Sequence, residues 1–86
     1  MKPLIEVTRE TEGTVHSMYL RYATEAVANT ISLDGDHYVN VDVASNEDVV
    51  GIEIVFPDDE SVDLVAQFAH ARGLSLAGVF DPPIAS

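Results

Sequence analysis

The sequence predicts a single α+β domain: a five-stranded antiparallel β-meander with one C-terminal helix packed on its apolar face. Three observations predict this class. Apolar and polar residues alternate with a period of two through residues 3–56. The spacing of apolar residues then changes to that of an amphipathic helix over 59–72. Finally, a chain of 86 residues has room for one hydrophobic core and no second domain.

The alternating part divides into five expected strands, at 3–9, 14–22, 26–33, 37–43 and 49–56. The clearest is HYVNVDV, in which three valines share one face and Tyr38, Asn40 and Asp42 lie on the other. Gly13 is expected in the first turn, because glycine tolerates a positive φ.

The last strand, VVGIEIVF, is expected to be half-buried. Its inward row is Val50, Ile52, Ile54 and Phe56. Gly51 and Glu53 then lie on the opposite face, and a four-residue loop, ASNE, would set Asn40 opposite Gly51 and Tyr38 opposite Glu53. Because glycine weakens a strand, Gly51 predicts a β-bulge or the close approach of another segment.

The stretch PDDESVDLVAQFAHARG predicts the helix at 59–72. Asp58, Asp59 and Ser61 are candidate N-caps, and Gly73 after Arg72 is a stop signal. The residues LSLAGVF at 74–80 resume the alternation and are compatible with a sixth strand. The last residues, 81–86, contain two prolines and are expected to form an irregular tail.

The charge of the chain is strongly negative, with fifteen acidic residues against four basic ones and a formal net charge of −11. Nucleic acids and anionic membrane surfaces require a positive footprint, so both are excluded as partners. The N-terminal sequence shows no secretory signal and no apolar run is long enough for a membrane helix, so a cytoplasmic protein is expected. Cysteine is absent, which excludes disulfides and thiolate metal sites.

Four segments together resemble a known family. The residues MYL at 18–20, VDV at 41–43, the acidic turn that follows and VVGIEI at 49–54 are similar to the family catalogued as domain of unknown function 2283. The resemblance covers about residues 3–56. Family members usually have aspartates before the tyrosine strand, where this chain has EGTVHSM, so no role of those aspartates is carried over.

The family consists of small bacterial proteins with no assigned activity, some of which lie beside small basic nuclease-like toxins. The resemblance therefore implies an antitoxin-like or accessory role.

No catalytic, cofactor or metal site is predicted, and the chain is not expected to be an enzyme. His16, His37 and His70 fall on a strand, a turn and a helix without metal-ligand spacing. No serine lies in a nucleophile motif, and no glycine-rich phosphate loop is present. The acids DDE at 58–60 are explained by helix capping, since acid–base catalysis needs a pocket that separates two pKa values.

The first functional hypothesis is a non-enzymatic protein-interaction module whose partner is a small basic protein. Its contact surface would be the outward face of the sheet, with Glu6, Asp42 and Glu53 as charges and Tyr19 and Tyr38 as aromatic contacts. The alternative interpretation is that these side chains are only a solvated face.

The second hypothesis, from a different class, is a sensor of a small ligand or a divalent cation. Its site would be the DGDH turn at 34–37, which offers carboxylates and an imidazole, or a groove between two copies of the chain. A symmetric homodimer is expected on either hypothesis, because a small sheet leaves exposed edges and the apolar residues after the helix need cover. These apolar residues are Leu74, Leu76, Val79, Phe80 and Ile84.

Overall fold

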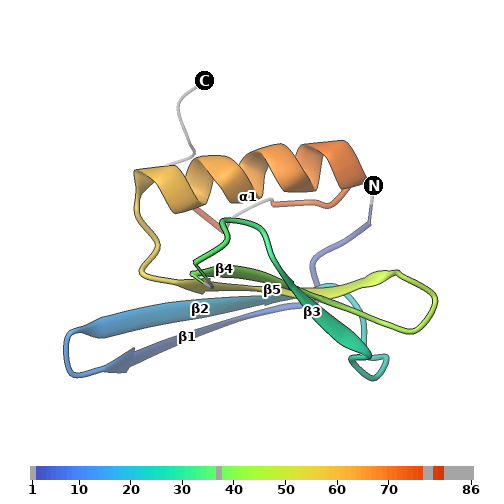
Figure 1. Ribbon diagram of the computed structural model, residues 1–86, viewed down its shortest axis with the longest axis horizontal. Coiled ribbons are helices and arrows are strands. Elements are labelled where there is room, and N and C mark those ends of the chain that lie inside the picture. The colour runs from blue at the N-terminus through green and yellow to red at the C-terminus, as the bar shows by residue number, and fades with distance from the viewer. Residues whose placement is uncertain (1, 37, 77–78, 81–86) are drawn as a thin grey trace.

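The computed structural model describes residues 2–36, 38–76 and 79–80. Its elements are β1 (Glu6–Glu12), β2 (Val15–Arg21), β3 (Asn29–Ser32), β4 (Val39–Val43), β5 (Val49–Val55) and α1 (Asp59–Arg72). The five strands form one antiparallel sheet, and α1 lies across one face of it (Figure 1). The α+β class, with an antiparallel sheet and one C-terminal helix, is therefore confirmed.

The order of the strands differs from that of a simple meander. The sheet runs β1-β2-β5-β4-β3, so a hairpin (β1–β2) and a three-stranded meander (β3–β4–β5) are joined through the pairing of β2 with β5. The apolar strand β5 is thereby in the middle of the sheet, where both of its edges are hydrogen-bonded. The charged strand EVTRETE and the short strand NTIS take the two edges.

The first strand lies three residues later than its sequence pattern predicts, over 6–12 instead of 3–9. Hairpin pairing explains this shift, because Glu12 pairs with Val15 across the turn and keeps the polar end of β1 in the ladder. Gly13 occupies the turn with φ of 63°, as expected. The third strand is shorter than predicted, 29–32 instead of 26–33.

The register between β4 and β5 is shifted by two residues from the predicted one. Asn40 pairs with Glu53 and Asp42 pairs with Gly51. The loop after β4 is one residue longer than ASNE, and a bulge adds Val50 as a second residue opposite Val43. A shift of two residues leaves every side chain on its face, so Ile52 and Ile54 are buried and Glu53 is exposed, as predicted.

The helix begins and ends where its capping residues predict. Asp58 is the N-cap, and its carboxylate accepts a hydrogen bond of 2.8 Å from the N–H of Ser61. Gly73 ends the helix in the left-handed region, and the N–H of Leu74 donates to the carbonyl of Ala69 at 2.8 Å. Within the ranges described, no helix is both long and apolar enough to cross a bilayer.

The core lies between α1 and the covered face of the sheet. Its buried members come from β2 and the residue after it, from β4, β5 and α1, and from the segment after the helix: Met18, Leu20, Tyr22, Val39, Val41, Val43, Val49, Ile52, Ile54, Val65, Ala69, Leu74 and Val79. Full burial of one such aliphatic side chain stabilises the fold by about 1.5–3 kcal/mol relative to its exposure. The apolar row of the sheet and the apolar stripe of the helix therefore hold the two layers together.

The described residues after the helix, 74–76 and 79–80, fold back onto this core and form no sixth strand. Leu74 makes only an isolated parallel bridge with Lys2, and the carbonyl of Leu76 accepts from the N–H of Val79 in a turn. Leu74 and Val79 are buried within their own chain, so these two side chains need no cover from a second copy. The expected tail at 81–86 lies outside the described residues.

Candidate interaction surface

The uncovered face of the sheet holds a hydrogen-bonded group of side chains around Gly51. The hydroxyl of Tyr19 on β2 donates to a carboxylate oxygen of Asp42 on β4, at 2.8 Å. Thr30 on β3 donates to the other oxygen of the same carboxylate, at 2.6 Å. The ring of Tyr19 reaches Asp42 by crossing β5 at Gly51, where a Cβ would overlap the phenol. The close approach predicted at Gly51 is therefore made by Tyr19.

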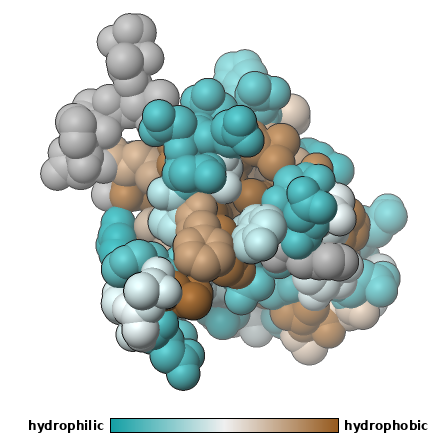
Figure 2. All heavy atoms as spheres, turned by 60° about the vertical axis from the view of Figure 1, so that its left-hand side comes forward, coloured by the Kyte–Doolittle hydropathy of each residue, from teal (hydrophilic) through white to brown (hydrophobic). Residues whose placement is uncertain are grey.

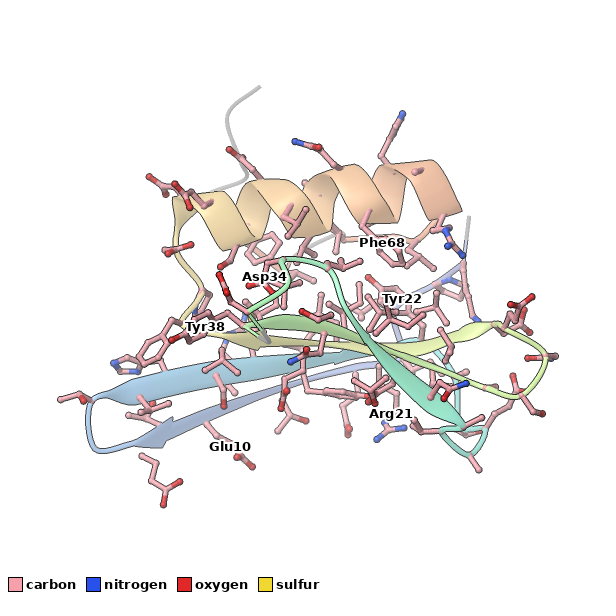
Figure 3. All side chains as sticks on the ribbon, viewed as in Figure 1. Glu10, Arg21, Tyr22, Asp34, Tyr38 and Phe68 are labelled. Carbon is pink, nitrogen blue, oxygen red and sulfur yellow. The ribbon has the colours of Figure 1, made fainter. Side chains whose placement is uncertain are left out.

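Other acidic side chains of this face also have neighbours within the sheet. Glu53 accepts from the side-chain amide of Asn40 at 3.2 Å. Glu6 is paired in register with Arg21, whose guanidinium lies 5.3 Å from the centroid of the Tyr19 ring. Figure 3 shows Arg21 and Glu10 on the side of the sheet away from the helix.

The four basic side chains are engaged by carbonyl oxygens and aromatic rings. Lys2 donates to the carbonyl of Val49 at 3.0 Å, and Arg9 donates to that of Val79 at 2.9 Å. Two guanidinium groups lie over rings, that of Arg21 over Tyr19 and that of Arg72 over Phe68. These four basic side chains thus contribute to the fold of the chain itself.

A groove of about 680 Å³ opens at the end of the molecule where the helix begins. Its walls come from the β3–β4 loop, from the end of β5 and from the first turns of α1. Five carboxylates border it: Asp34, Asp36, Asp58, Glu60 and Asp63. No basic side chain is among its described lining residues. Figure 3 places Asp34 at this end, between the sheet and the helix.

Two aromatic side chains form the apolar part of the groove. The rings of Tyr38 and Phe56 have centroids 5.8 Å apart and are tilted by 58°. Both rings are well exposed, with 47% of Tyr38 and 43% of Phe56 accessible to solvent. Figure 2, which brings this end of the molecule toward the viewer, shows apolar side chains bordered by hydrophilic ones.

The exposure of Phe56 corrects the sequence prediction, which placed it in the inward row of β5. Phe56 has a φ of 57°, in the left-handed region, and this turn of the backbone takes its ring out of the alternation. Its N–H donates to the carbonyl of His16 at 2.8 Å, and its carbonyl accepts from the hydroxyl of Ser61 at 3.4 Å. The peptide groups before and after Phe56 are thus held in place between the end of β5 and the start of α1.

Two groove carboxyls have lowered pKa values, which keeps them ionised. A hydrogen bond from the N–H of Ser61 lowers the pKa of Asp58 below its usual 3.8. Desolvation alone would raise the pKa of Asp34, but hydrogen bonds from the N–H of Asp36 and the hydroxyl of Ser32 outweigh it and lower the value. Both groups are held as anions, which favours cation binding.

The residues predicted to bind a partner lie in two places. Glu6, Tyr19, Asp42 and Glu53 share the uncovered face of the sheet, where the sequence predicts them. Tyr38 lies apart from them, at the groove and beside Phe56. A role of these five residues in binding stays a prediction.

The groove itself was not predicted, because its acids fall in separate segments with separate local explanations. Turn chemistry accounts for Asp34 and Asp36, and helix capping accounts for Asp58. The fold brings these segments together. A cation site at the 34–37 turn also stays a prediction: His37 lies outside the described residues, and among those described no group of three or more ligating side chains is placed to hold a metal ion.

Comparison of this chain with protein-family models, with curated proteins and with solved structures gives no match. The resemblance to domain of unknown function 2283 therefore stays a prediction.

Proposed function

We propose that this protein is a non-enzymatic interaction module that binds a small basic protein. The observation that supports the proposal best is the groove bordered by five carboxylates and by no described basic side chain. Charges of one sign around a recess attract a partner of the opposite sign, accelerate its association and reject partners of like charge. An antitoxin-like or accessory role, as the family resemblance implies, requires binding of this kind.

The use of the basic residues within the fold also supports the proposal. Lys2 and Arg9 donate to main-chain carbonyls of the chain itself, and Arg72 lies over Phe68. They therefore serve the fold, while the groove carboxylates face solvent. A basic partner would supply the opposite charges.

The absence of a catalytic role is part of the proposal. A general acid at neutral pH needs a raised pKa, whereas Asp34 and Asp58 have lowered values. Carboxylates that stay ionised suit the binding of cations better than proton transfer.

Affinity capture tests this function. The chain is immobilised and exposed to a lysate of its source organism, and each captured protein is identified and then titrated in purified form. We expect a small basic protein whose affinity falls as salt is raised, because exposed charges are screened over roughly 8 Å at physiological ionic strength. Specific partners that are acidic, or whose affinity ignores salt, would contradict the proposal.

A further inference from the structure

The groove combines charge with exposed aromatic surface. Polar and apolar walls meet there, since Val39 and Leu64 line the groove together with the ring pair of Tyr38 and Phe56. A charge cluster that only keeps a protein soluble does not require exposed rings at its centre. The ligand that fits this lining is a cation with an apolar or planar body.

The backbone of Phe56 explains why its ring lies at the groove. A bulky residue with φ of 57° is conformationally strained, and glycine is the residue that takes this region without cost. The chain nevertheless has a phenylalanine there, with its ring exposed and not in the core. Strain of this kind persists only where the surrounding structure holds it, and hydrogen bonds to His16 and from Ser61 do so here.

We infer that the groove is the docking site for an arginine-bearing segment of the partner, with a guanidinium packed against the rings of Tyr38 and Phe56. This inference rests on the proposed function and specifies its site and its ligand chemistry. The planar guanidinium stacks on aromatic faces and donates up to five hydrogen bonds, which suits a recess bordered by carboxylates. A lysine ammonium is a more strongly hydrated point charge and gains less from the rings.

The test is a fluorescence-anisotropy titration of the full chain with a labelled peptide of alternating arginine and serine, at low salt and neutral pH. The groove variant combines Asp36→Asn, Glu60→Gln and Asp63→Asn. It leaves Asp34 and Asp58 unchanged, because those two side chains cap a turn and the helix.

The matched control is a sheet-face variant that combines Glu6→Gln, Glu10→Gln and Glu53→Gln. Both variants change the formal net charge of −11 by the same three units, so a difference in their binding cannot come from net charge. We expect the groove variant to weaken peptide binding by about tenfold or more, and the control by less than about threefold.

A further variant, Phe56→Gly, separates binding from folding. Glycine accepts the left-handed backbone and removes the exposed ring, so the thermal midpoint should hold or rise. Binding of the arginine peptide should nevertheless fall by about fivefold or more, toward the affinity of the matching lysine–serine peptide.

The results show separately whether the groove is the docking site and whether the protein binds basic partners at all. If the groove and control variants weaken peptide binding equally, or if Phe56→Gly binds the peptide fully, the groove is not the docking site. The proposal that the protein binds basic proteins would still stand. Failure of both the arginine and the lysine peptide to bind the parent chain at low salt would overturn the inference and count against the proposed function as well.

Discussion

The phenol ring of Tyr19 lies across Gly51, on the central strand of the sheet, and its hydroxyl donates to Asp42 on the strand beyond. Three neighbouring strands, β2, β5 and β4, are tied together by this one side chain. A Cβ at position 51 would overlap the ring, so any other residue there has to displace it. An aromatic side chain that covers a strand glycine also restores packing that the glycine lacks.

The first prediction concerns this relationship. Gly51→Ala should destabilise the protein by about 2 kcal/mol, because the ring of Tyr19 has to move. In a Tyr19→Ala background the same substitution should cost far less, since the obstructing ring is gone. Chemical denaturation of the four proteins in this double-mutant cycle measures the coupling. Additive effects would show that Tyr19 does not determine the residue at position 51.

The hydroxyl of Tyr19 makes stability sensitive to alkali. Burial, reinforced by the hydrogen bond to Asp42, raises the pKa of Tyr19 to about 12 from its usual 10.0. Because the folded state holds this proton more tightly than the unfolded state, the contribution to stability is complete below pH 10.0 and is lost as the pH rises toward 12.

Tyr19→Phe should therefore lower the free energy of unfolding by about 1 kcal/mol at neutral pH. The deficit should shrink above about pH 10, because the parent protein loses the same contribution there. Denaturation at a series of pH values measures this, with Tyr38→Phe as the control at an exposed tyrosine. A deficit that stays constant up to about pH 12 would rule out the link to the phenol proton.

The helix N-cap makes stability sensitive to acid. The pKa of Asp58 is lowered below 3.8, so the cap stabilises the fold above that pH and its contribution is lost as the pH falls through the lowered value. Asp58→Ala should lower the thermal midpoint at neutral pH, and the difference from the parent should shrink below about pH 4. Asp58→Ser keeps an uncharged cap, so its thermal midpoint at neutral pH should lie close to that of the parent protein. Equal midpoints for the alanine and serine variants would contradict this role.

The open edge of β3 is where we expect a symmetric homodimer to form. The strand has only uncharged side chains, NTIS, and its Ile31 is 52% exposed, whereas the opposite edge strand is protected by charges. Two chains of −11 repel each other, so added salt should strengthen the dimer, opposite to its effect on a basic partner.

Light scattering at micromolar concentration tests the dimer, with Ile31→Lys as the variant expected to be a monomer with an unchanged fold. A parent chain that is monomeric at both low and high salt would sink this prediction.

The sequence predicts the faces of the strands well and their pairing less well. Ile52, Ile54 and Glu53 lie on the sides that their alternation predicts, because a period of two is a local property. The pairing of β2 with β5 joins segments about thirty residues apart. The bulge at Val50 lies in the pairing of β4 with β5. The long-range pairing leaves no local pattern from which it could be predicted, whereas Gly51 gives a local signal for the bulge beside it.

The groove could not be predicted for a related reason. Asp36 and Glu60 each have a sufficient local explanation, as a turn residue and as an acid in the first turn of a helix. Phe56 was expected in the core because alternation continues through it, and only its positive φ reverses its direction. Only the tertiary fold brings these residues together in one surface.

The central claim, that a basic partner docks in the groove at the start of α1, is tested most directly by mapping amide chemical shifts. The chain labelled with nitrogen-15 is titrated at low salt with the peptide of alternating arginine and serine. If the peptide docks in the groove, we expect the largest shift changes in and beside it, at Asp34, Asp36, Tyr38, Phe56 and Glu60. The largest changes on the uncovered face of the sheet, or no changes at all, would contradict it.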